Sequence, residues 1–551
     1  MLKVFQGINK TWIRNQQKYL STSTTNLEQI RTNLHRRYET ATSLKELTTE
    51  DNKLLNPLSK IICTIGPASH SPERIQELVN EGMLVLRINC SHATRQEMEE
   101  RVKWLRQSDG LHSNSNSNST NGVNNLRAIL FDTKGPEIRT SELPKPLTLT
   151  RGESVTLSSF NNNNEQSDIV VTYENIESVV DIGQAILLDD GLIDLTVIGK
   201  EKKRLLCEVQ NDGSLGDRKG VNIPGANLNL PAMTELDREH LSIAVELDAD
   251  YVAASFVRTS NDVLQIRSYL QELHEIQRKP DLHPIPKIIS KIESAEALQN
   301  FDEILRVSDG IMVARGDLAV EIPFSVVTRA QKMIVSKCNL AGKPVVVATQ
   351  MLENMIENPR PTRAEVSDVV NAVYDGADCV MLSGESAKGK FPIESCQTLA
   401  RIARQADVSY SEYSNTSLPS KPNKPSMARA VVQAARDEEV DLIICVTSSG
   451  KTAEKLSAEK GPVPIMAFVA SEKVGRQLNL NRGVWPVFGE NLELPVGDES
   501  ELQYMLRPKQ AVRKAKELGL VHSGDTVLIV LSEPSSSDLE QTFSTRTAVV
   551  K

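Results

Sequence analysis

The sequence predicts a mixed α/β protein built on a (β/α)8 TIM barrel, with an inserted small β-barrel domain and a C-terminal α/β domain. Three observations predict this fold class. A short apolar run, a polar residue and a helical segment recur eight times from Lys60 onward, a β-rich stretch interrupts this pattern, and a second α/β pattern follows residue 411. Eight such units are expected to close into a barrel whose functional groups lie at the C-terminal ends of the strands.

Each of the eight apolar runs is followed by a polar side chain. With that residue in parentheses, the runs are 61–63 (Thr64), 84–86 (Arg87), 128–131 (Asp132), 251–254 (Ser255), 287–292 (Glu293), 310–314 (Asp317), 345–348 (Thr349) and 379–382 (Ser383). Helix signals between the runs agree with this pattern. Ser71 and Pro72 form a typical helix start, and Thr362 with Glu365 forms a capping box.

The interruption contains short β-rich runs separated by Gly and Asp turns, namely 154–157, 169–172, 185–188, 192–198 and 204–209. We interpret it as a small all-β domain that could close over the site as a lid. The C-terminal pattern predicts a helix over 427–438 and strands at 442–446, 465–469, 485–487 and 526–531. The predicted division is 1–55 transit peptide and linker, 56–135 first part of the barrel, 136–231 lid domain, 232–411 second part of the barrel, and 412–551 C-terminal regulatory domain.

Composition narrows the class of function. The chain has 551 residues, 39% hydrophobic and 25% charged, as in ordinary globular proteins, and no apolar run approaches a membrane span. Its net charge of -9 argues against general nucleic-acid binding. The seven cysteines are scattered without a C-x-x-C pair, so we expect reduced, buried thiols and small-molecule chemistry.

The first 27 residues contain four cations and no acid, and their basic and apolar side chains separate on a helical wheel. This pattern is typical of a transit peptide, so we expect import into the mitochondrial matrix, with the plastid or the cytoplasm as alternatives. A disordered or packing N-terminal arm is another interpretation of the same residues.

Glu293 and Asp317 end two strands of one predicted βαβ unit, so the two carboxylates should meet at one edge. Few protein oxygen ligands, with room for water and phosphate, are typical of Mg2+ sites, and Lys291 lies on the same side of its strand as Glu293. The alternative is an ordinary Lys291–Glu293 ion pair with Asp317 merely capping a turn. Arg87, Asn89 and Ser91 alternate along a second strand, and Asp132, Thr133, Lys134 and Arg139 follow a third. Such a set predicts a phosphate site suited to phosphoryl transfer.

The sequence resembles the pyruvate kinase family over nearly all of residues 58–531. The motifs that carry the resemblance occur in order: CTIGPAS, LRINCSH, DTKGPEIRT, KGVNIPG, KIE, ARGDLAVE, ATQMLENM and RPTRAEVSDV. The resemblance implies transfer of the phosphoryl group of phosphoenolpyruvate to ADP, giving ATP and pyruvate in the last step of glycolysis. It also implies Mg2+ and K+ as cofactors and a homotetramer, without nucleic-acid or membrane partners.

The resemblance also assigns roles to residues. As catalytic groups it implies Lys291, Thr349 and Arg87; as substrate contacts Arg87, Lys291, Gly316, Asp317 and Thr349; as nucleotide contacts Asn89, Ser91, His92, Arg139 and Lys219; as Mg2+ ligands Glu293 and Asp317; and as K+ ligands Asn89, Ser91, Asp132 and Thr133. Glu137 stands where potassium-dependent members carry glutamate. Residues 447–452 match the family's loop for an effector phosphate, although a plain helix cap is an alternative there.

Two departures from the family pattern affect these expectations. Ala319 replaces a usual glycine two residues beyond Asp317, and the segment after the last predicted strand, 532–537, lacks the glycines of members that respond to fructose 1,6-bisphosphate. Two other functions share some of these features: a Mg2+-dependent lyase or aldolase on the same barrel, and a catalytically silent paralogue. The lid with Lys219 and the K+ set count against the first, and the intact catalytic residues count against the second.

Overall fold

The computed structural model describes residues 57–109, 125–143, 145–159, 167–201, 203–226, 228–277, 284–417, 426–489, 500–533 and 542–551. The predicted transit segment 1–55 lies outside these residues, as do the low-complexity stretches 113–122 and 161–164. Asn56–Lys551 belong to a single structural unit. Among the described residues, every helix is too short or too polar to cross a membrane.

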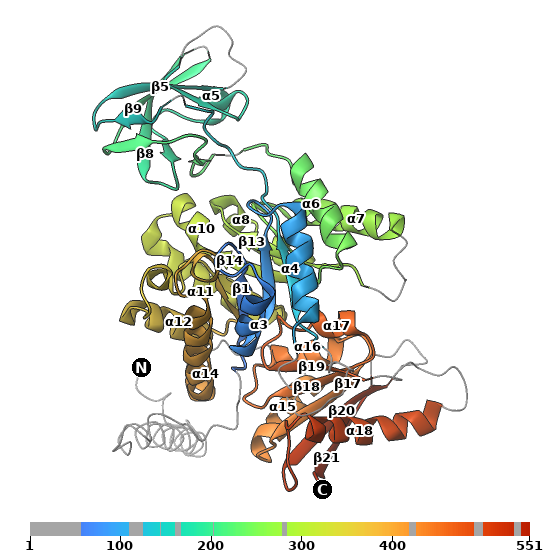
Figure 1. Cartoon of the computed structure of the whole chain (residues 1–551). Helices are drawn as coiled ribbons and strands as arrows, with labels where there is room; N and C mark the ends of the chain where they lie inside the picture. The colour runs from blue at the N-terminus through green and yellow to red at the C-terminus, as the bar shows by residue number, and fades with distance from the viewer. Residues whose placement is uncertain are drawn as a thin grey trace, which may run out of the picture. The chain divides into compact units, whose positions relative to one another are not determined.

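All eight predicted barrel strands are present, and they form a closed parallel barrel in the order β1-β16-β15-β14-β13-β12-β3-β2 (Figure 1). The strands are β1 (Lys60–Thr64), β2 (Met83–Asn89), β3 (Ala128–Asp132), β12 (Tyr251–Ala254), β13 (Lys287–Ile292), β14 (Gly310–Ala314), β15 (Val345–Ala348) and β16 (Cys379–Leu382). Because the strands are parallel, their C-terminal ends share one mouth of the barrel. The predicted functional residues at the strand ends are thereby brought to the same side.

Helices follow the barrel strands, as the periodicity predicts. They are α3 (Pro72–Asn80), α4 (Arg95–Gln107), α6 (Glu235–Glu246), α7 (Ser260–Ile276), α8 (Ala295–Gln299), α9 (Phe301–Val307), α10 (Arg315–Glu321), α11 (Phe324–Ala341), the 3-10 helix η1 (Glu353–Ile356), α12 (Arg363–Asp375), α13 (Gly384–Ala387) and α14 (Pro392–Ser417). Ser71 caps α3, and Thr362 with Glu365 forms the predicted capping box of α12. The predicted barrel boundary at residue 411 falls inside α14, because the helix continues to Ser417.

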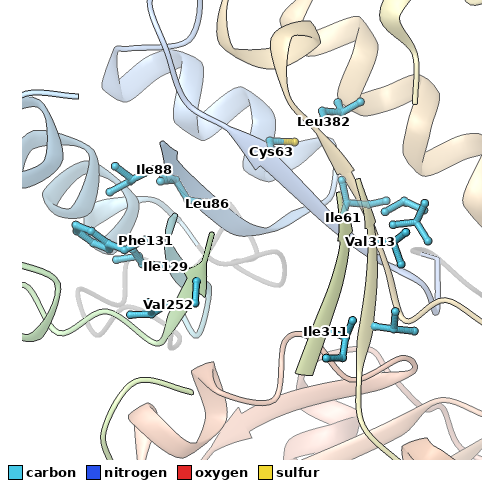
Figure 2. Packing of buried hydrophobic residues seen from close by; sticks show 14 of the residues in the cluster. Ile61, Cys63, Leu86, Ile88, Ile129, Phe131, Val252, Ile311, Val313 and Leu382 are labelled. Atoms are coloured by element: carbon cyan, nitrogen blue, oxygen red, sulfur yellow. The ribbon is translucent and has the colours of Figure 1, made fainter. Parts of the chain in front are cut away.

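Alternate residues of the barrel strands face two different layers. Ile61, Cys63 and Ile311 belong to the apolar layer between strands and helices, part of which is shown in Figure 2. Ile62 and Ile289 instead belong to the cluster that fills the barrel interior. Since strand side chains alternate with a period of two, Thr64 and Lys291 lie on the inward-facing side of their strands. The charged strand ends therefore continue the interior of the barrel at its mouth.

The inserted region is the predicted all-β domain. Its main sheet has the order β11-β7-β8-β9-β5-β6, and a two-stranded ribbon pairs β10 with β4. The elements are β4 (Leu147–Leu149), β5 (Ser154–Ser159), β6 (Ile169–Val171), α5 (Ile176–Val179), β7 (Ala185–Leu188), β8 (Ile193–Glu201), β9 (Arg204–Val209), β10 (Gly213–Leu215) and β11 (Val221–Asn222). Arg139 bridges to Gly220 and Thr140 bridges to Val171, so this short segment joins the two edges of the sheet.

The C-terminal region contains a five-stranded sheet in the order β19-β18-β17-β20-β21. Its strands are β17 (Leu442–Thr447), β18 (Ile465–Val469), β19 (Val484–Phe488), β20 (Thr526–Glu533) and β21 (Thr542–Val549), and its helices are α15 (Met427–Asp437), α16 (Lys451–Ala458), α17 (Glu472–Arg476) and α18 (Ser500–Glu517). The antiparallel strand β21 was not predicted. Leu480 packs into the interior cluster of the barrel, and Arg476 pairs with Asp250, which precedes β12, at 2.8 Å. The C-terminal region thus closes the N-terminal end of the barrel and leaves the other end open.

Candidate active site

Lys291, at the end of β13, is the centre of a buried charge cluster. Its Nζ lies 2.8 Å from Glu293 Oε1 and 3.2 Å from Asp132 Oδ1, and it donates a hydrogen bond of 2.7 Å to Ser255 Oγ. Burial disfavours the charged form, but Asp132 and Glu293 outweigh this effect and raise the pKa of Lys291 above its usual value. Lys291 is therefore a permanent cation at the barrel mouth. The ion pair with Glu293 exists, but it is one part of a larger cluster rather than an isolated surface pair.

Arg87 adds a second buried cation from the end of β2. Its guanidinium donates to Asp132 Oδ2 at 2.6 Å and to Thr64 Oγ1 at 2.8 Å. Burial alone would raise the pKa of Asp132, but Arg87 and Lys291 together lower it. Asp132 therefore stays ionised and holds both cations in place. Two preorganised positive groups at one point are what a transferring phosphoryl group needs.

Glu293 and Asp317 are the two carboxylates proposed from the sequence as metal ligands. Glu293 follows β13 directly, and its Oε2 accepts a 2.6 Å hydrogen bond from the amide of Phe256. Burial, with a smaller contribution from the negative charge of Asp317, raises the pKa of Glu293 to about 7 against the opposing effect of Lys291. Asp317 lies in the first turn of α10, immediately after β14.

These two carboxylates fit a Mg2+ ion. Glu293 Oε1 is buried and lies 2.8 Å from the Lys291 ammonium, and the repulsion between the Glu293 and Asp317 carboxylates, which raises the pKa of Glu293, would be relieved by a divalent cation. Within the described residues, His, Cys, Asp and Glu side chains gather nowhere in groups of three or more that could hold a metal. A Mg2+ ion at Glu293 and Asp317 would thus have few protein ligands and would keep positions for water and phosphate oxygens.

Thr349 follows β15 in a strained backbone conformation. Its φ is 69° and that of Gln350 is 54°, values that a β-branched residue such as threonine rarely adopts. The strain is held by neighbouring groups: Thr349 Oγ1 accepts from the amide of Gly316 at 2.8 Å, and Arg315 donates to the Thr349 carbonyl at 2.7 Å. Such strain is concentrated at functional sites, and here it joins the Thr349 loop to the start of α10.

A cleft of about 380 Å³ opens between the inserted domain and the barrel mouth. Predicted site residues Arg139 and Asp317 line it, together with Glu137, Asp190, Asn222 and Glu321. Asn222 of the inserted domain donates to Glu321 of α10 at 2.8 Å, so the two parts touch across the cleft. Lys219 precedes Gly220, which lines the cleft, and its Nζ pairs with Asp189 Oδ1 at 2.9 Å.

The proposed K+ and nucleotide residues at the end of β2 lie next to β3. Asn89 and Asp132 are partners in register, and Thr133 comes next in the chain. The Ser91 amide donates to Asn89 Oδ1 at 3.2 Å, and the Ser91 and His92 side chains are exposed. Asn89, Asp132 and Thr133 are thus neighbours, whereas Ser91 and His92 face solvent.

Several residues of the site were given no role by the sequence, although Ser255 was expected at a strand end. Ser255 links Lys291 to the Thr133 carbonyl, to which its hydroxyl donates at 2.7 Å; its position at the end of an apolar run was the available signal. Phe256 positions Glu293 through an amide in a backbone with φ of 53°, which nothing in the sequence indicates. Arg315 could have been identified as a site residue because it lies two residues before Asp317 in the sequence.

The loop at residues 447–452 has the predicted arrangement of strand, turn and helix. It follows β17 and leads into α16, with Gly450 in a left-handed conformation at φ of 78°. The Gly450 amide donates to Thr447 Oγ1 at 3.1 Å. Phosphate binding and plain helix capping are both compatible with this geometry.

Comparison with protein families decides the class of this barrel. Residues 56–396 match the family described as pyruvate kinase, barrel domain, and residues 425–543 match pyruvate kinase, alpha/beta domain. The chain belongs to the pyruvate kinase family. It is therefore a phosphotransferase, and the lyase or aldolase alternative is excluded.

Individual pyruvate kinases match at similar levels. The protein named pyruvate kinase from Bacillus licheniformis is 40% identical over 503 residues, which cover 90% of this chain and 81% of the relative. That from Sporosarcina psychrophila is 40% identical over 483 residues, covering 86% and 78%, and one from Staphylococcus aureus is 40% identical over 484 residues, covering 87% and 78%.

These comparisons correct one prediction. We expected import into the mitochondrial matrix, with plastid import as an alternative, but the similar pyruvate kinases come from Bacillus, Sporosarcina and Staphylococcus, which are bacteria without such organelles. The mitochondrial assignment is therefore wrong. It relied on four cations, the absence of acids and the separation of basic and apolar residues in the first 27 positions, a pattern that other basic amphipathic segments share.

Proposed function

We propose that this enzyme transfers the phosphoryl group of phosphoenolpyruvate to ADP, producing ATP and pyruvate, with Mg2+ and K+ as cofactors. The observation that carries the proposal is the buried cluster in which Lys291 and Arg87 converge on Asp132 beside Glu293, at the open end of the barrel. Two cations and two carboxylates at one point are suited to neutralising and positioning phosphate groups.

In this proposal, the position of each side chain at the barrel mouth determines its role. Arg87 binds the phosphate of the substrate, and Lys291 stabilises the charge that develops on the transferring group and on the enolate oxygen. Glu293 and Asp317 would hold the Mg2+ ion, which would supply positive charge to offset the negative charge of the substrate. Gly316 contributes to substrate binding. Thr349, held in its strained conformation, lies where the enolate carbon is protonated to form the methyl group of pyruvate.

The inserted domain supplies the nucleotide side of the cleft in this proposal. Arg139 already lines the cleft, while Lys219 must exchange its partner Asp189 for a phosphate of the nucleotide. Asn89, Ser91 and His92 complete the nucleotide contacts from the barrel. Asn89, Ser91, Asp132 and Thr133 would hold K+, and a homotetramer, implied by the family resemblance, is the proposed assembly.

The reaction is tested by incubating the purified full chain with phosphoenolpyruvate, ADP, Mg2+ and K+. Pyruvate is measured by coupling to lactate dehydrogenase, and ATP is measured separately. Equal amounts of the two products support the proposal. Release of inorganic phosphate without ATP, or no turnover at all, contradicts it and would favour a catalytically silent paralogue.

Activity should depend on K+. Glu137 lines the cleft and pairs with Arg139, whose Nε donates to Glu137 Oε2 at 2.6 Å, so the position is negatively charged and partly paired. A lysine at position 137 would supply a positive charge in place of K+. Glutamate at this position supplies none, so the enzyme still needs K+. We expect much faster turnover in KCl than in tetramethylammonium chloride at equal ionic strength. Equal rates in the two salts would contradict this prediction.

Fructose 1,6-bisphosphate should not activate the enzyme in the usual way. Ser532 and Glu533 end β20, and the following residues 534–541 lie outside the described residues. The sequence of residues 533–537 contains a proline and no glycine; proline lacks a backbone N–H donor, and the charge of a glutamate repels a dianion. Titration of this effector at subsaturating phosphoenolpyruvate should leave the apparent substrate affinity unchanged. A large rise in affinity would show that the serine hydroxyls suffice.

A further inference from the structure

The four residues that follow β12, 255–258, contact both the charge cluster and the two connections of the inserted domain. Ser255 accepts from Lys291, and the Phe256 amide donates to Glu293. A Cβ atom on Gly135, where the chain enters the inserted domain, would lie 2.9 Å from the Phe256 ring. The first connection is therefore packed against the residue that positions a proposed metal ligand.

Arg258 holds the second connection, through which the chain returns to the barrel. Its guanidinium donates to the carbonyls of Leu230 at 2.8 Å and Pro231 at 3.0 Å, with a longer contact of 3.5 Å to the Leu228 carbonyl. Arg258 is only 8% exposed although it lines the cleft. A buried guanidinium with a rigid set of donors aimed at neighbouring carbonyls fixes the path of that backbone.

The position of Arg258 is itself fixed by the start of α7. The Arg258 amide donates to Asp262 Oδ2 at 2.9 Å, and the same carboxylate takes part in the capping box with Thr259. The Arg258 carbonyl accepts from Asn300 at 3.0 Å. Arg258 is thus fixed to the barrel, and the backbone of residues 228–231 that it holds leads from the inserted domain.

We propose that Arg258 is a positioning residue for phosphoryl transfer, which sets the inserted domain over the cleft by clamping the backbone of residues 228–231. This inference rests on the proposed function, in which the inserted domain supplies nucleotide contacts. Arg258 touches neither reacting group. It acts through the placement of Arg139 and Lys219, so its loss should affect ADP more than phosphoenolpyruvate, whose contacts come from the barrel.

The test compares three variants of the full chain: Arg258→Gln, Arg258→Lys and the control Arg267→Gln. Arg267, which lies in α7, is a good match because its guanidinium also donates to a backbone carbonyl, that of Val307 at 2.9 Å, and to Asp309 at 2.8 Å, but these partners belong to the barrel. Steady-state kinetics give KM for ADP and for phosphoenolpyruvate. Hydrogen exchange followed by mass spectrometry gives the protection of residues 228–233 without requiring activity.

For Arg258→Gln we expect KM for ADP to rise about tenfold, as for the loss of one charge-assisted hydrogen bond, with a smaller change in KM for phosphoenolpyruvate and in kcat. Amides of residues 228–233 should exchange faster. Arg258→Lys should restore part of both effects, and Arg267→Gln should show neither. Unchanged exchange and KM for ADP in Arg258→Gln, or equal changes in Arg267→Gln, would overturn the inference. A wild-type chain without turnover would instead disprove the proposed function, while the exchange data would still test the clamp.

Discussion

Replacing Lys291 with methionine should lower kcat by about 10² to 10³, the usual effect of removing one preorganised electrostatic group. Methionine keeps most of the side-chain volume but removes the charge that lies 2.8 Å from Glu293 and 3.2 Å from Asp132. Mg2+ binding should persist, because both proposed ligands remain and the metal ion compensates for the missing positive charge. The measurement is steady-state turnover at saturating substrates, with Mn2+ binding followed in parallel.

Lys287→Met is the matched control for this experiment. Lys287 lies on the same strand at its opposite end, where it donates to the Gln477 carbonyl at 3.1 Å. That variant removes a lysine from β13 without touching the cluster, so it should keep near-normal kcat. Near-normal turnover in Lys291→Met would exclude the assigned role of Lys291.

Replacing Glu293 with glutamine should have an even larger effect, because it removes a proposed metal ligand. Glutamine has the same shape, and its carbonyl oxygen can still accept the hydrogen bond that Phe256 donates at 2.6 Å. We expect Mg2+ affinity to fall by more than the roughly 100-fold that accompanies loss of a residue supporting a ligand, and turnover to become undetectable at moderate Mg2+.

Glu296→Gln provides the comparison for this second variant. Glu296 lies three residues further along the chain and also lines the cleft, but it is outside the charge cluster. It should bind Mg2+ as the wild type does. If Glu293→Gln bound Mg2+ normally, the metal would have to lie elsewhere.

The barrel and its charged mouth were predictable because their signals are local. Each polar residue that interrupts an apolar run, such as Arg87, Glu293 or Thr349, marks a strand end, and parallel strands bring these ends together. The partners within the mouth were less predictable. That Arg87 holds Asp132, or that Ser255 lies between Lys291 and Thr133, depends on side-chain geometry that alternation alone does not determine.

The features that the sequence did not reveal depend on strand pairing, on contacts between residues distant in the chain, or on backbone conformation. Strand β21 forms by antiparallel pairing with β20, and Arg258 acts on carbonyls that lie 27 to 30 residues away. Phe256 adopts a positive φ, a conformation that a sequence usually indicates by a glycine or an asparagine at that position. The KGVNIPG motif did not indicate that Lys219 pairs with Asp189, because a partly exposed lysine can form ion pairs with several neighbouring carboxylates.

The most direct test of the proposed site is Mn2+ binding followed by electron paramagnetic resonance, in the wild type, Glu293→Gln and Asp317→Asn. The structure predicts a single tight site in the wild type, tightened further by phosphoenolpyruvate and lost in both variants, since each removes one of two protein ligands. Undiminished Mn2+ binding in the two variants would contradict the assignment of these carboxylates as the metal ligands at the barrel mouth.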